Sequence, residues 1–251
     1  MILWLTGVTS AGKTWLGDFL QHYHGYVHIE GDEHMAVYTA DKCDITKNIF
    51  RAFYDYWLQE KEAPLELWRP YFQMFIDKAV EQYRKSPETD IVITFSTYPR
   101  AARDYARAEI KRATGQDLTM ILLSMSIDDY ARRQKNKLVE WATAHKQTIE
   151  EIWNTHYQRK GEYSEEKLDA TYREAKEFRG LEPIQSDEEN SYTVNTDNYH
   201  VNVVPEVTRI LKLRQCPYLD YDVIKKIRTD RIEGYAKLKE ELKEKETRES
   251  K

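Results

Sequence analysis

The sequence predicts an α/β fold in which helices cover both faces of a parallel sheet, giving a three-layer α/β/α sandwich. Short apolar runs alternate with longer helical segments, a pattern that requires right-handed crossovers between parallel strands. A glycine-rich segment, GVTSAGKT, directly follows the first apolar run. A long, charged helical segment, residues 127–178, stands between the fourth and fifth runs. We therefore expect one α/β domain with a helical lid inserted before its last strand.

The expected strands are apolar and β-branched runs bounded by turn residues. ILWL, residues 2–5, comes first, and YVHIEGD, residues 26–32, ends at Gly31 and Asp32. DIVITFS, residues 90–96, is the clearest strand, because Ser-Pro precedes it and Tyr-Pro follows it. LTMILLSMS and SYTVNT complete the sheet.

Segments between these strands are expected to be helices. The first predicted helix, TWLGDFLQHY, follows the glycine-rich segment. Two more precede the third strand: NIFRAFYDYWLQE and YFQMFIDKAVEQYRK. The third strand is followed by RAARDYARAEIKRA, and the fifth by VVPEVTRILKL. In the insertion, Trp141 and Trp153 are among the few large apolar anchors. The end of the chain, RIEGYAKLKEELKEKETRESK, has the Glu/Lys spacing of an exposed helix. We therefore divide the chain into an α/β domain, residues 1–214, and a charged helical tail, residues 215–251.

The composition limits the class of protein. A formal net charge of −5 over 251 residues argues against a general nucleic-acid-binding surface. Two cysteines, Cys43 and Cys216, are too few for a disulfide framework and lack metal-ligand spacing. The chain has no apolar run of the roughly 18 residues that a membrane span needs, and its start, MILWLTG, lacks a basic leader. We expect a cytoplasmic protein with neither nucleic acid nor membrane as a partner; a homodimer is an open alternative.

The segment GVTSAGKT, residues 7–14, matches the phosphate-binding P-loop pattern between a strand and a helix. Gly7 and Gly12 let the backbone curl so that its N–H groups point at phosphate oxygens, and the following helix adds the positive end of its dipole. Lys13 is expected to reach the β- and γ-phosphates of ATP, and the Thr14 hydroxyl is expected to ligate Mg²⁺. The expected nucleotide-binding residues are Gly7, Thr9, Ser10, Ala11, Gly12, Lys13 and Thr14.

Asp32 is the expected catalytic carboxylate, and Lys13 is also expected to be a catalytic residue. It stands at the carboxyl end of the predicted second strand, the edge at which open α/β sheets bind their ligands. A carboxylate there would accept the proton of an attacking hydroxyl, contact the substrate and help to hold Mg²⁺. The alternative is a helix N-cap. No other strand end is expected to offer a carboxylate, because the third ends in Ser96 and the fourth in Ser126.

Several further residues are candidates for contact with phosphate or substrate. Arg132 and Arg133, at the start of the insertion, are expected to stabilise charge at the γ-phosphate, and a solvated basic helix face is the alternative. Arg100 and Arg103, three residues apart on one helix face, are expected to meet an anionic acceptor. Ser96 is a further candidate on the substrate side.

The chain resembles the adenylylsulfate kinases over residues 1–135 and 176–212. ILWLTGVTSAGKTWL resembles their opening strand and P-loop, IEGD their Asp-Gly-Asp strand end, and FSTYPRAARDYAR the segment after their third strand. EFRGLEPIQSDEENSYTVNT is similar to their stretch near the adenine, and gluconate kinases share parts of the last two segments. DITKNIFR keeps an Asn-Ile pair and a final Arg of the family, which implies that Asn48 and Arg51 line the acceptor pocket. The resemblance implies a P-loop NTPase fold and an ATP-dependent kinase activity.

The chain departs from that family on the acceptor side. Glu33, His34 and Met35 follow the Gly-Asp pair where the family has an Arg, and Ile45 and Phe50 replace two more arginines. The phosphosulfate of adenylylsulfate needs cationic partners. The resemblance therefore implies the same phosphoryl-transfer machinery with a different acceptor.

The sequence thus predicts a kinase that uses ATP and Mg²⁺ to phosphorylate a hydroxyl of a small metabolite, with anionic metabolites included. A sulfotransferase-like enzyme with a phosphoadenosine phosphosulfate donor is one alternative, because TSAGKTWL is also similar to the phosphosulfate-binding loop of that class. A nucleotide-regulated interaction protein is another, with the charged insertion and tail as its partner surface.

Overall fold

The computed structural model describes residues 1–32, 56, 61, 64–97, 99–156, 161–175, 181–197 and 199–249. Its centre is a sheet of five parallel strands in the order β2-β3-β1-β4-β5. The strands are β1 (Ile2–Gly7), β2 (Val27–Glu30), β3 (Ile91–Thr94), β4 (Leu118–Ser124) and β5 (Ser191–Asn195). The predicted parallel sheet is confirmed, with β1 in the middle.

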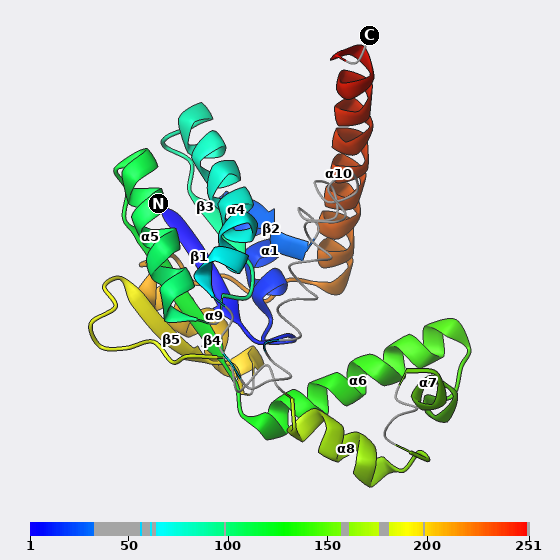
Figure 1. Cartoon of the computed structure of the whole chain (residues 1–251). Helices are drawn as coiled ribbons and strands as arrows, with labels where there is room; N and C mark the ends of the chain where they lie inside the picture. Colours follow the sequence, from blue (N-terminus) through cyan, green and yellow to red (C-terminus); the bar gives the residue numbers. More distant parts are fainter. Residues whose placement is uncertain are drawn as a thin grey trace.

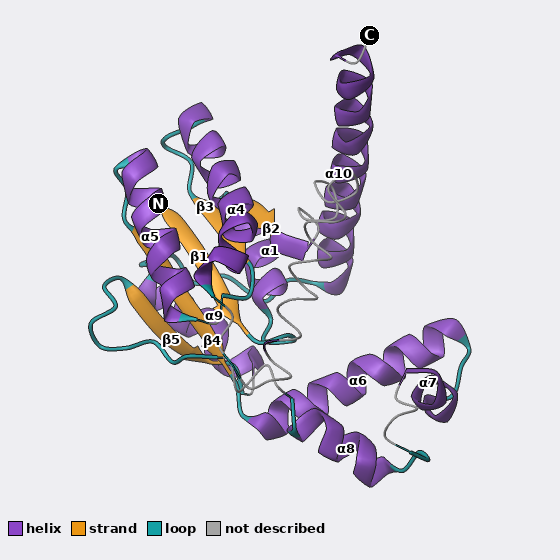
Figure 2. Ribbon diagram, in the orientation of Figure 1, coloured by secondary structure: helices purple, strands orange, loops and turns teal. Residues whose placement is uncertain are grey.

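Helices cover both faces of the sheet (Figure 1, Figure 2). On one face, Leu3 and Leu5 of β1 pack with α1 (Lys13–His24) and α9 (Tyr199–Ile210). On the other, Ile2 and Trp4 pack with α4 (Leu65–Lys85) and α5 (Arg100–Thr114). Successive side chains of a strand point to opposite faces, so a strand covered on both sides is apolar throughout.

The charged insertion folds into helices that project away from the sheet (Figure 1). They are α6 (Ile127–His145), α7 (Ile149–His156) and α8 (Glu165–Arg173). Trp153 is buried, and its indole N–H donates to the Gly161 carbonyl at 2.8 Å. Trp141 is 41% exposed and stacks on His145 one turn later, so its prediction as an anchor is wrong.

The tail forms one long helix, α10 (Tyr221–Glu249), whose far end extends away from the domain (Figure 1). The segment before it belongs to the core: Leu219 is buried, and the ring of Tyr218 lies 5.2 Å from that of Trp15. The tail therefore begins as part of the packed domain. Within the described part of the chain, the helices are all too short or too polar to cross a membrane.

Several element boundaries differ from the sequence prediction. Strand β1 continues to Gly7, and β3 and β4 end at Thr94 and Ser124, each two residues earlier than predicted. Strand β2 ends at Glu30 because its partner β3 ends at Thr94, directly opposite, and Asp32 is already helical. Helix α4 begins at Leu65, which places Pro70 inside it at the cost of one backbone hydrogen bond. The helix predicted from NIFRAFYDYWLQE lies outside the described residues apart from Tyr56.

A buried ion pair joins α5 to the segment that precedes β5. The side chains of Arg103 and Glu188 have no exposed surface, and two guanidinium nitrogens donate to the two carboxylate oxygens at 2.9 and 2.7 Å. Arg107 adds a contact to Glu188 at 2.8 Å. Burial alone would raise the pKa of Glu188, but hydrogen bonds from Arg103, the Gln185 backbone and Arg107 outweigh it and lower the pKa to about 2. Glu188 is therefore ionised in the fold.

We predict that Glu188→Gln lowers the free energy of unfolding by about 3 kcal/mol at pH 7, because a carboxylate whose pKa is lowered by folding stabilises the folded state. This contribution is complete above the unfolded pKa, near 4.5, and is lost as the pH falls toward 2. Urea unfolding of both proteins at pH 7 and pH 3 measures it. The difference should at least halve at pH 3, and an equal difference at both pH values would contradict the prediction.

Candidate active site

The P-loop connects the carboxyl end of β1 to α1, in the middle of the sheet. Gly7 and Gly12 have φ angles of +142° and +91°, which L side chains rarely adopt. A Cβ on Gly7 would also lie 2.4 Å from the Leu123 carbonyl oxygen. Ser10 has a positive φ of 67°. The backbone thus curls as a phosphate-binding loop requires.

Lys13 folds back over the loop. Its ammonium group donates to the carbonyl oxygens of Gly7 at 2.8 Å and Val8 at 3.0 Å. Of the other loop residues, Thr9 is exposed and Ala11 is fully buried. A positive charge is therefore held against the loop backbone, next to the N-terminus of α1.

Thr14 and Glu30 pair across the interface between α1 and β2. The Thr14 hydroxyl donates to Glu30 Oε1 at 3.0 Å, and Glu30 is only 4% exposed. Since Glu30 is the last residue of β2, the expectation that Asp32 is the only strand-end carboxylate is wrong. Glu30 is visible in the sequence IEGD, but the prediction that the strand continues to Asp32 places Glu30 inside the strand and not at its end.

Asp32 lies two residues beyond the end of β2 and is exposed. The carboxyl ends of parallel strands meet at one edge of the sheet, so Asp32 stands at the same edge as the P-loop. Its roles as base, metal ligand or substrate contact remain predictions. Asn48 and Arg51, the predicted acceptor residues, lie outside the described residues.

Ser96, two residues beyond the end of β3, contacts the P-loop. Its hydroxyl donates to the Gly7 carbonyl at 3.0 Å. Next to it, the Thr97 N–H donates to the Thr6 hydroxyl at 2.7 Å, which in turn donates to the Thr97 carbonyl at 3.1 Å. These bonds join the segment that follows β3 to the end of β1. Ser96 therefore borders the loop, and its contact with a substrate stays a prediction.

The first turns of α6 contact the P-loop. Arg133 donates to the Ser10 carbonyl at 3.0 Å and to the Thr196 carbonyl just beyond β5. The side chain of Arg133 is 16% exposed, whereas that of Arg132 is 60% exposed. Arg133 is therefore largely buried against the P-loop and Arg132 is largely exposed, although the sequence predicts the same role for both.

The two arginines expected to meet an anionic acceptor have protein partners instead. Arg100 donates to both carboxylate oxygens of Asp187 at 3.1 and 2.7 Å. Arg103 is buried against Glu188 and the Glu182 carbonyl, so its assignment to the acceptor site is corrected to a structural one. Helix spacing shows that the arginines share a face, but not which acidic groups another part of the chain brings to them.

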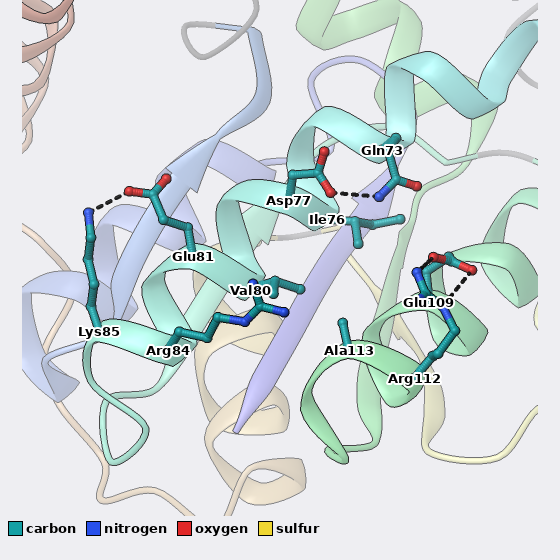
Figure 3. A pocket seen from close by; sticks show the side chains of 10 residues that line it. All are labelled: Gln73, Ile76, Asp77, Val80, Glu81, Arg84, Lys85, Glu109, Arg112 and Ala113. Carbon is teal, nitrogen blue, oxygen red and sulfur yellow. Dashed lines mark hydrogen bonds and ion pairs between the residues drawn. The ribbon is translucent and has the colours of Figure 1, made fainter.

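A hollow of about 640 Å³ lies between α4 and α5, apart from the P-loop (Figure 3). Its charged rim is largely paired within itself: Lys85 with Glu81 and Arg112 with Glu109, both at 2.5 Å. No P-loop or strand-end residue lines it. The hollow is therefore separate from the P-loop and from the carboxyl ends of the strands.

The donor set at this edge fits Mg²⁺ bound together with a nucleotide. Among the described residues, no three His, Cys, Asp or Glu side chains gather into a metal cluster. Mg²⁺ does not need one, because it keeps several waters and binds through one or two carboxylates plus substrate phosphates. Thr14 and Glu30 are the side chains that offer such a partial site.

Several solved structures are similar to this chain. A "putative kinase" from Chloroflexus aurantiacus is similar with a TM-score of 0.51 and 12% identity, over 84% of this chain and 96% of that one. A gluconokinase from Sinorhizobium meliloti (TM-score 0.41, 16% identity, 97% and 95% of the two chains) and a sugar kinase from a Janibacter species (0.47, 14%, 85% and 95%) are also similar. No family model matches the chain, and no curated protein sequence gives a significant match. The chain therefore shares the α/β fold of the Chloroflexus structure, with helices on both faces of a parallel sheet.

We predict that Arg133→Gln lowers the affinity for ADP with Mg²⁺ about 10-fold, because it removes the charge-assisted hydrogen bond from Arg133 to the Ser10 carbonyl of the P-loop. Arg132→Gln is the matched control and should change the affinity less than about threefold, since this side chain is largely solvated. Isothermal titration calorimetry measures both. Equal losses in the two variants would contradict the separate roles of these arginines.

Proposed function

We propose that this chain is an ATP-dependent kinase that transfers the γ-phosphate to a hydroxyl of a small metabolite. The observation that carries the proposal is the Thr14–Glu30 pair beside Lys13, at the edge of the sheet where Asp32 also stands. In phosphoryl transfer the protein contributes mainly by positioning the reactants and stabilising charge, and little by covalent chemistry. A curled loop, a cation, a hydroxyl–carboxylate pair and an exposed carboxylate supply these functions.

Each residue has a role in this proposal. The loop N–H groups and Lys13 bind the β- and γ-phosphates, with the Lys13 ammonium turning from the loop carbonyls to phosphate oxygens. Thr14 and Glu30 hold Mg²⁺, which neutralises charge on the phosphate oxygens when it is bound. Asp32 accepts the proton of the acceptor hydroxyl as this group attacks the γ-phosphate.

The acceptor is proposed as a hydroxyl compound without a strong requirement for negative charge. An anionic acceptor is expected to meet arginines, and two of the candidates, Arg100 and Arg103, pair with Asp187 and Glu188. A sulfotransferase-like reaction is the weaker alternative, because the buried Glu30 carboxylate beside the loop repels an anionic donor that arrives without a metal. Binding of ATP with Mg²⁺ compared with a 3′-phosphoadenosine nucleotide, measured by thermal shift, separates the two.

We predict that wild-type protein releases ADP in response to one acceptor class and that Lys13→Ala retains less than about a tenth of that kcat, a loss of at least ~1.4 kcal/mol of barrier lowering. The measurement is coupled ADP release against adenylylsulfate, sugar acids, polyols, nucleosides and amino-alcohols. Circular dichroism controls for the fold of the variant. ADP release that no acceptor stimulates would contradict the kinase proposal and favour a nucleotide-regulated interaction protein.

We predict that Asp32→Asn lowers kcat by roughly 10²–10⁴, because a positioned general base contributes about that factor. Affinity for ATP with Mg²⁺ should change little. Glu30→Gln is the comparison: it should raise the Mg²⁺ concentration needed for half-maximal rate about 10-fold. Turnover of Asp32→Asn near the wild-type rate would show that this carboxylate only caps a helix.

A further inference from the structure

A buried polar cluster links the C-terminal helix to the core. The side chains of Asp18 in α1 and His28 in β2 have no exposed surface, and Oδ1 of the first lies 3.1 Å from Nδ1 of the second. The other ring nitrogen of His28 lies 2.8 Å from the Thr94 hydroxyl. From α10, Arg231 contacts one Asp18 oxygen at 2.5 Å and Arg228 contacts the other at 3.3 Å.

This cluster lies directly behind the Thr14–Glu30 pair. Asp18 follows Thr14 by one turn of α1, about 6 Å along the helix axis. His28 precedes Glu30 by two residues on the same face of β2, about 6.6 Å along the strand. The Thr14–Glu30 and Asp18–His28 pairs therefore both connect α1 to β2, about one helical turn apart. The first lies at the candidate site and the second lies deeper in the core.

Helix α1 and strand β2 pack closely against each other at the level of His28. Gly17 of α1 lies against the His28 ring, and a Cβ on it would come within 2.3 Å of the ring nitrogen Nε2. Helix and strand can approach this closely only because residue 17 has no side chain. The His28 ring therefore packs directly against the backbone of α1.

Arg231 supplies charge that the buried carboxylate needs. Burial alone would raise the pKa of Asp18, but the hydrogen bonds and charges of His28 and Arg231 outweigh it and keep the pKa below its ordinary value. Asp18 is therefore ionised in the fold. The side chain of Arg231 is itself only 9% exposed, and that of Asp18 has no exposed surface. Removal of one partner of a buried charge is strongly disruptive.

We propose that Arg231 is a positioning residue for the metal–nucleotide site: it holds Asp18 against His28 and so sets the spacing between Thr14 and Glu30. This inference rests on the proposed function, in which those two residues hold Mg²⁺. The charged C-terminal helix is then a working part of the kinase domain, because its first turns fix the distance between the P-loop helix and β2.

The test compares Arg231→Met with Lys226→Met, a control on the same helix whose side chain is 79% exposed. Calorimetric titration with a non-hydrolysable ATP analogue, in Mg²⁺ and in EDTA, separates metal-dependent from metal-free binding. Arg231→Met should lower the affinity in Mg²⁺ about 10-fold and the affinity in EDTA less than about twofold. Arg231→Lys keeps the charge and should recover most of the loss, and Lys226→Met should match the wild type.

If Arg231→Met does not fold, Arg228→Met replaces it, because that side chain is 44% exposed and contacts the same carboxylate. It should shift the ratio of the two affinities in the same direction and by less. A lower melting temperature with an unchanged ratio would overturn the proposal, since a merely structural arginine gives that result. A wild-type protein that does not bind the analogue would instead overturn the proposed function, and the inference with it.

Discussion

The packing of α1 against β2 is the constraint on which the site depends. The interface is buried, so each polar group within it must find a partner, and the Thr14–Glu30 and Asp18–His28 pairs satisfy this requirement. Both pairs also fix how far α1 stands from the strand. Lys13 begins that helix and Glu30 ends that strand, so the positions of a cation and a carboxylate at the edge of the sheet follow from one contact.

The segment before β5 and the start of α10 are both joined to the core by buried ion pairs. Glu188, before β5, is ionised and enclosed by arginines of α5, and Asp18 is ionised and enclosed by arginines of α10. A buried carboxylate is tolerated only when its charge and hydrogen bonds are fully met. The segment before β5 and the start of α10 are therefore held in specific positions as well as by apolar contact.

The insertion is coupled to the P-loop through a few hydrogen bonds. Arg133 joins the Ser10 carbonyl to the Thr196 carbonyl, and Gln134 donates to the Ser10 hydroxyl at 2.9 Å. Ser10 has a φ of 67°, a conformation that residues other than glycine adopt uncommonly. Arg133 and Gln134 therefore join the first turns of α6 directly to the loop.

The sequence by itself determined the fold class and the position of the P-loop. Apolar runs, helical spacing and a Gly-Lys-Thr after a strand are local patterns, and each of the five strands forms where a run predicts it. Only the tertiary structure decided the partners: Glu30 for Thr14, Glu188 for Arg103 and Asp18 for Arg231. A local pattern shows which residues carry charge or face the core. The choice of partner depends on how distant elements pack, and the free energy of that packing is spread over many contacts that no single segment encodes.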